Sequence, residues 1–165
     1  MISNRMLFAV GAAACALLLA SGYYLQYVEG QDPCPLCHVQ RGFYYACGAV
    51  FLVGALHGAG SIWYSIGAFV FALGGAGVAA RQVWLQHLPP ELVPACGPDL
   101  FYMLQTFPLG RTIEKLFTGT GQCAEVKWRF LGLSIAEWSL AWFVALGVLA
   151  LWVGFRRQSP TKLPR

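Results

Sequence analysis

The chain has 165 residues, of which 58% are hydrophobic and only 11% are charged. A soluble domain carries about 25% charged residues, so this composition excludes an ordinary soluble enzyme and indicates an integral membrane protein. The net charge is +4, and four of the eleven basic residues lie in the last ten positions. Such a tail is typical of a membrane flank and argues against a nucleic-acid partner.

Four apolar runs without Asp, Glu, Lys or Arg follow in chain order: residues 6–28, 42–58, 62–80 and 138–155. A helix needs about 20 apolar residues to cross the hydrocarbon core, and a backbone in lipid must satisfy its own polar groups. The first run lacks an Ala-x-Ala cleavage site, so we interpret it as a span rather than a signal peptide. The sequence predicts an all-α integral membrane protein, a single domain over residues 1–165 built as a four-helix transmembrane bundle.

Two outer loops follow from this count, over residues 29–41 and 81–137, because four spans leave both termini on one side. Lys and Arg concentrate in the C-terminal tail, and Arg5 precedes the first span, so we expect cytoplasmic termini and outer loops in the oxidising compartment. The cysteines divide accordingly: Cys34, Cys37, Cys96 and Cys123 lie in the outer loops, and Cys15 and Cys47 lie inside spans, where we expect them to pack.

The four outer cysteines allow three disulfide pairings. Two structural disulfides are one interpretation, but a bridge between Cys34 and Cys37 would close a very short loop and constrain little unfolded chain. A zinc site is a second interpretation, but the 26 residues between Cys96 and Cys123 do not fit the two close pairs of a structural four-cysteine site, and we expect no metal. A Cys-x-x-Cys pair at a helix start, where the dipole favours a thiolate, favours redox chemistry.

Arg41 lies four residues after Cys37, which places both side chains on one face if the second span begins near Cys37. An arginine at the membrane edge indicates function by default, and here it would favour the Cys37 thiolate. It could also bind a quinone, whose carbonyl oxygens gain negative charge on reduction. The alternative is an anchor that extends its charged end to the membrane surface and takes no part in chemistry.

Two stretches carry a resemblance to a known family. The segment CPLCHVQR (34–41) and the segment CAEVKWRFLGL (123–133), together with the four spans, resemble the DsbB family of bacterial thiol–quinone oxidoreductases. The resemblance implies an inner-membrane enzyme that reoxidises a periplasmic DsbA-like dithiol oxidase. It also implies that the electrons pass to ubiquinone or menaquinone as cofactor.

The same resemblance implies roles for individual residues. Cys34–Cys37 would be the quinone-coupled disulfide, with Cys37 nearest the quinone and Arg41 beside it. Cys96–Cys123 would be the disulfide that reacts with the partner, with Cys96 as the sulfur that is attacked. A weaker match places His87 near the quinone.

Residues 99–117 mix aromatic and charged residues, with apolar side chains at helical spacing, and fit a short helix on the membrane surface. Ordinary loop packing is the alternative. For the whole chain, a vitamin-K-epoxide-reductase-like enzyme is the runner-up, although its Cys-x-x-Cys pair is expected late in the bundle. A non-catalytic four-span scaffold stapled by two disulfides is the third interpretation.

Overall fold

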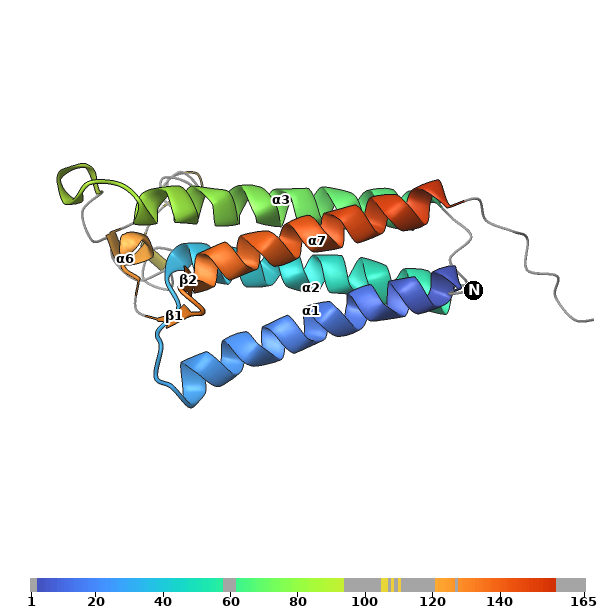
Figure 1. The fold of residues 1–165 in the computed structure, drawn as a ribbon, viewed down its shortest axis with the longest axis horizontal. Coiled ribbons are helices and arrows are strands. Elements are labelled where there is room, and N and C mark those ends of the chain that lie inside the picture. The colour runs from blue at the N-terminus through green and yellow to red at the C-terminus, as the bar shows by residue number, and fades with distance from the viewer. Residues whose placement is uncertain are drawn as a thin grey trace, which may run out of the picture.

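The computed structural model describes residues 3–57, 62–93, 105, 106, 108, 110, 121–126 and 128–156. Within this part of the chain, four long helices lie alongside one another (Figure 1): α1 (Asn4–Tyr27), α2 (Pro35–Leu56), α3 (Ile62–Gln86) and α7 (Ile135–Phe155). All four are long and apolar enough to cross a membrane. The predicted four-helix membrane fold is confirmed.

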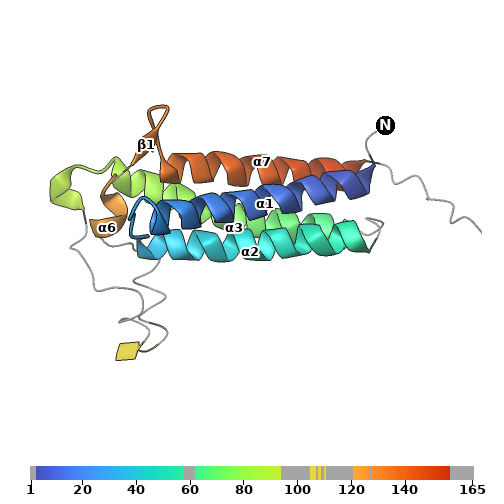
Figure 2. The same cartoon turned by 90° about the horizontal axis from the view of Figure 1, so that it is seen from below.

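Both ends of the described chain lie at one end of the bundle, as expected for four spans (Figure 1). The opposite end carries the short elements: η1 (Pro90–Leu92), α6 (Gly121–Ala124), β1 (Arg129–Phe130) and β2 (Leu133–Ser134). Seen from below, this end still gathers α6, β1 and the start of α2 (Figure 2). The segments that contain Cys34 and Cys123 therefore meet at the end of the bundle opposite the described chain ends.

Two helices extend beyond the apolar runs, which corrects the predicted loop boundaries. α2 begins at Pro35 rather than near residue 42, and α3 continues to Gln86 rather than ending near residue 80. Proline suits a first helical position because its missing N–H has no intrahelical acceptor there. The added turns hold Gln40 and Gln82, which are both 5% exposed, so their amides face the protein interior rather than lipid. A hydropathy pattern cannot distinguish these two environments.

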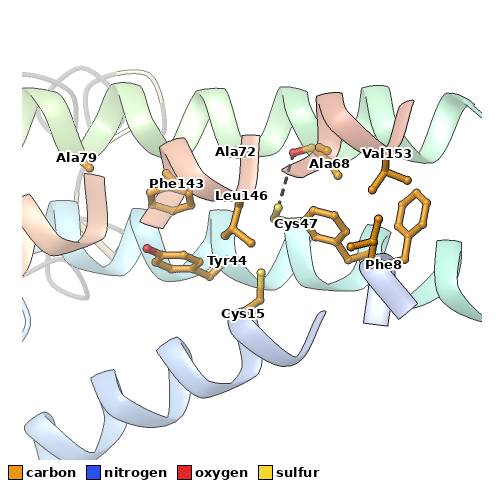
Figure 3. Close-up of a cluster of buried hydrophobic side chains, with 13 residues drawn as sticks. Phe8, Cys15, Tyr44, Cys47, Ala68, Ala72, Ala79, Phe143, Leu146 and Val153 are labelled. Carbon is orange, nitrogen blue, oxygen red and sulfur yellow. Dashed lines mark hydrogen bonds between the residues drawn. The ribbon is translucent and has the colours of Figure 1, made fainter. Parts of the chain in front are cut away.

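The core of the bundle is closely packed around α3 (Figure 3). The Phe43 ring of α2 packs against Gly74, and the Phe143 ring of α7 packs against Gly75. The Phe143 ring in turn stacks on Tyr44, with centroids 4.0 Å apart and planes at 12°. Small residues let helices approach closely where lipid supplies no hydrophobic driving force, so these glycines determine the spacing of α2, α3 and α7.

Replacing Gly75 with alanine is expected to destabilise the bundle, because a Cβ there would overlap the Phe143 ring. Overpacking of this kind lowers the free energy of unfolding by about 1–3 kcal/mol. The matched control is Gly77→Ala on the same helix, where a Cβ meets no atom within 4 Å. Thermal unfolding in detergent should show a lower midpoint for Gly75→Ala only; equal midpoints for the two variants would contradict this packing.

The two cysteines inside the spans pack in the core, as predicted. Cys15 is 1% exposed and Cys47 is fully buried. The Cys47 thiol donates to the carbonyl oxygen of Ala68 at 3.6 Å, across the interface between α2 and α3 (Figure 3). They lie in the main core cluster, whereas Cys34 and Cys123 belong to a second cluster.

A short hairpin leads into α7. Leu131 and Gly132 form its turn with φ of 53° and 83°, and two positive φ values in succession are typical of a two-residue hairpin turn. Ser134 then caps α7, because its hydroxyl accepts from the Glu137 N–H while the Glu137 carboxylate accepts from the Ser134 N–H. The sequence analysis missed this hairpin because two-residue strands are too short to show an alternating pattern. The surface helix predicted over residues 99–117 lies largely outside the described residues.

Candidate functional site

The start of α2 builds the Cys-x-x-Cys pair. Cys34 is the residue that caps the helix, Pro35 occupies its first position, and Cys37 lies in its first turn. The two sulfurs are 2.9 Å apart and both are thiols. A disulfide spans about 2.05 Å, so oxidation of the two thiols, with loss of two electrons and two protons, would require only a small approach of the sulfurs to form the predicted Cys34–Cys37 bond.

A third thiol reaches this pair from the far side of the sequence. The short helix α6 places Cys123, which is fully buried, in one apolar cluster with Cys34 and Leu36. Hydrogen bonds with the thiols of Cys123 and Cys37, together with burial, raise the pKa of Cys34 well above its ordinary value. Cys34 therefore stays protonated in this arrangement. Cys96, the predicted partner of Cys123, lies outside the described residues, so that disulfide stays a prediction.

Two glutamines complete the surroundings of the sulfurs, and the sequence analysis missed both. Gln82 donates from Nε2 to the sulfurs of Cys34 and Cys37, each at 3.4 Å. Gln40 donates from Nε2 to Oε1 of Gln82 at 2.6 Å. Gln40 follows Cys37 by three residues, and this spacing in the sequence could have predicted that the two side chains share a helix face. Gln82 comes from another helix, so no local spacing could have predicted its contact with the sulfurs.

A partly open cavity of about 410 Å³ lies against this cluster, at the end of the bundle that carries Cys34 and Cys37. All four long helices line it, with apolar walls that include Leu18 and Leu25 of α1 and Trp138 and Trp142 of α7. α1 packs closely on α2 and only sparsely on α7. Figure 1 shows α1 diverging from α7 toward this same end, where the cavity lies.

The polar part of the cavity wall is small, and it includes groups on α2 and α3 together with the carboxylates of Asp32 and Glu125. Cys37 and Arg41 both line the cavity, as their spacing predicts for one helix face. Gln40 and Gln82 line it as well. The site thus joins an apolar chamber to a redox pair, two amides and one guanidinium.

Helix α1 holds the Arg41 guanidinium. Arg41 Nη1 donates to Oε1 of Gln26 at 2.6 Å, and Arg41 Nη2 donates to the carbonyl oxygen of Gly22 at 2.9 Å. The guanidinium also lies over the ring of Tyr23, 4.7 Å from the centroid. These contacts satisfy the charge at the membrane edge. The same contacts direct Arg41 toward α1. The Cys37 sulfur instead accepts a hydrogen bond from Gln82, which lies on α3.

His87 does not line this cavity. Its Nδ1 lies 2.8 Å from the carbonyl oxygen of Val83, and its Nε2 lies 4.0 Å from the Glu137 carboxylate. It lines a smaller, polar recess beside the hairpin instead. The predicted role of His87 at a quinone stays a prediction.

Comparisons with known proteins show which family the chain belongs to. The family model described as "Disulfide bond formation protein DsbB" matches residues 4–153. A protein from Nitrosococcus oceani named "Disulfide bond formation protein B" is 50% identical over 155 residues, which cover 92% of this chain and 91% of that protein. Relatives of the same name from Hahella chejuensis and Methylococcus capsulatus are each 47% identical over at least 90% of both chains. The resemblance seen in the two cysteine-bearing stretches is thereby confirmed, and the chain belongs to the DsbB family of disulfide bond formation proteins.

Proposed function

We propose that this disulfide-forming membrane oxidoreductase reoxidises a DsbA-like dithiol oxidase in the periplasm and passes the electrons to membrane quinone, either ubiquinone or menaquinone. The proposed location is the bacterial inner membrane, with both termini cytoplasmic and the redox loops periplasmic. One observation carries the proposal: the Cys34 thiol contacts the thiols of both Cys123 and Cys37, and Cys34 and Cys37 line a cavity between membrane-spanning helices.

The cavity suits a quinone on chemical grounds. Its apolar and aromatic walls match a lipid-soluble ring and tail, and Arg41 supplies the donors and the positive charge that reduced carbonyl oxygens require. When bound, a quinone would supply an acceptor for two electrons and two protons. Cys34 and Cys37 both line the cavity, and we assign Cys37 as the sulfur nearest the quinone because it shares a helix face with Arg41.

The exchange steps follow from the order of the sulfurs. A partner thiolate attacks Cys96 of the Cys96–Cys123 disulfide, which forms a mixed disulfide and releases the Cys123 thiolate. Cys123 then attacks Cys34, which forms a Cys34–Cys123 bond and releases the Cys37 thiolate. The contact between Cys123 and Cys34 supports this step, because the attacking sulfur already lies beside its target.

Two further exchanges restore the Cys96–Cys123 disulfide. The second thiol of the partner displaces Cys96, which leaves the partner oxidised. The Cys96 thiolate then attacks Cys123 and releases Cys34 as a thiol. Closing the Cys34–Cys37 disulfide again releases two electrons and two protons, which is the amount that reduction of one quinone consumes.

The test is a turnover assay with the purified protein, a reduced DsbA-like protein as donor and a soluble ubiquinone analogue as acceptor. One quinone should be reduced for each partner molecule oxidised. A scaffold stapled by disulfides would oxidise no partner and reduce no quinone, and that result would overturn the proposal. The vitamin-K-epoxide-reductase-like alternative does not agree with the family match.

Replacing Arg41 with histidine is expected to raise the apparent KM for quinone about tenfold or more, because the charge and the planar donor fork leave the cavity wall. Arg41→Lys should recover only part of the loss, since lysine keeps the charge and lacks the fork. Steady-state kinetics on protein normalised for folding would measure both effects.

The matched control for Arg41 is Arg81→His. Arg81 lies over Trp84, 4.3 Å from the ring centroid, near the same end of the bundle, and it does not line the cavity. Its substitution should leave the quinone KM unchanged. If Arg41→His also left the KM unchanged and lowered only the yield of folded protein, Arg41 would be a membrane anchor alone.

A further inference from the structure

The buried Gln82 amide touches both sulfurs of the redox pair at once. Its Nε2 lies 3.4 Å from each of the Cys34 and Cys37 sulfurs, and the residue is 5% exposed. The side chain comes from α3, whereas the two cysteines open α2. This contact brings a hydrogen-bond donor to the sulfurs inside the protein, where water is scarce.

A second buried amide determines how the first one points. Gln40 donates to Oε1 of Gln82 at 2.6 Å, and the Cys37 thiol donates to the same oxygen over a longer distance of 3.7 Å. The short bond from Gln40 fixes Oε1, and this leaves Nε2 as the end of the amide that lies 3.4 Å from both sulfurs. The reverse orientation would aim a carbonyl oxygen at them and would repel a thiolate. Gln40 is also 5% exposed, so the pair of amides lies in the interior.

We propose that Gln82 is the donor that stabilises the Cys37 thiolate and holds the two sulfurs together, and that Gln40 is the positioning residue that keeps the Gln82 amide in this orientation. The inference rests on the proposed function, because the Cys37 thiolate forms in the exchange step proposed above. An uncharged donor suits this place, because an added charge inside the spans would need a partner of its own. Hydrogen bonds to a charged group are stronger than neutral ones, so the amide favours the thiolate over the thiol.

Other groups that influence the charge on Cys37 surround the same site. The thiols of Cys34 and Cys123 lie close to it, and Asp32, Arg41 and Glu125 line the cavity that Cys37 also lines. The Arg41 guanidinium is held by α1. Besides the Cys34 thiol at 2.9 Å, Gln82 is therefore the side chain that donates directly to the Cys37 sulfur.

The test uses the full-length reduced protein and three variants: Gln82→Met, which removes the donor at similar volume, Gln82→Glu, which places a carboxylate there, and Gln40→Met. Alkylation of Cys37 by iodoacetamide at pH 7, followed by site-resolved mass spectrometry, reports the thiolate fraction. The rate should fall about tenfold in Gln82→Met and further in Gln82→Glu. Gln40→Met should give a smaller fall.

A second readout is the equilibrium of the Cys34–Cys37 pair with a glutathione buffer. Loss of the donor destabilises the reduced pair, so the equilibrium in Gln82→Met should shift about tenfold toward the disulfide. Neither thiol measurement involves a quinone or a partner protein, so failure of the proposed electron route and failure of this inference are distinguishable.

The control is Ser65→Ala, another buried polar residue of α3, which is 4% exposed and does not line the cavity. In Ser65→Ala protein, the Cys37 alkylation rate and the glutathione equilibrium should both equal those of the unsubstituted protein. Unchanged alkylation and an unchanged glutathione equilibrium in folded Gln82→Met protein would overturn the inference. If that variant fails to fold, the isosteric Gln82→Glu protein decides: a Cys37 alkylation rate equal to that of the unsubstituted protein would overturn it equally.

Discussion

Replacing Cys37 with serine is expected to abolish quinone reduction while leaving the protein folded. Cys34 and Cys37 both line the cavity at the start of α2, and a serine hydroxyl at position 37 can neither form a disulfide with Cys34 nor release electrons by closing one. The turnover assay with a reduced DsbA-like donor measures the effect. The loss should be complete rather than partial, because Cys34 without Cys37 cannot close the disulfide that releases the electrons.

The matched controls are the two cysteines in the core. Cys15→Ala and Cys47→Ala should keep activity, because both thiols belong to the main core cluster and neither lines the cavity. A small loss of thermal stability is the expected effect of removing a buried sulfur. Normal turnover in Cys37→Ser protein would show that electrons leave by another route, and loss of turnover in well-folded Cys47→Ala protein would assign chemistry to a thiol that we interpret as packing.

Replacing Cys123 with serine is expected to trap the partner protein on Cys96. In this variant Cys96 has lost its predicted disulfide partner, so it is available for a mixed disulfide with a DsbA-like protein that retains only its attacking cysteine. No neighbouring thiol then displaces the partner, because the serine hydroxyl does not take part in thiol–disulfide exchange. Incubation in a glutathione redox buffer followed by a non-reducing gel should show a one-to-one adduct.

The structure adds a second expected consequence for Cys123→Ser. The contact between Cys123 and Cys34 is lost as a route for exchange, so Cys34–Cys37 should no longer be reduced by the partner. The double variant with Cys96→Ser and Cys123→Ser is the control and should form no adduct. An adduct in otherwise unsubstituted protein that maps to Cys123, with Cys96 as a thiol, would reverse the two assigned roles.

Hydropathy and short spacings predicted much of this protein. Four uncharged runs are sufficient to predict four membrane helices, because a backbone in lipid has few alternatives to a helix. The spacing between Cys37 and Arg41 also predicted a shared face, because one helical turn brings residues four apart together. The boundaries were less accurate, since turns whose amides face the interior do not look like spans in a hydropathy pattern.

The tertiary structure alone decided which groups meet across helices. Gln82 and Cys34 are 48 residues apart in the chain, and Arg41 and Gln26 are 15 apart on different helices. No local pattern encodes such pairs, because they depend on how α1, α2 and α3 are spaced and rotated by packing at residues such as Gly74 and Gly75. By itself the sequence determined the spans, the CPLC pair and the family resemblance. Helix packing decided that the partner of the two sulfurs is a buried glutamine and that the Arg41 guanidinium is held by α1.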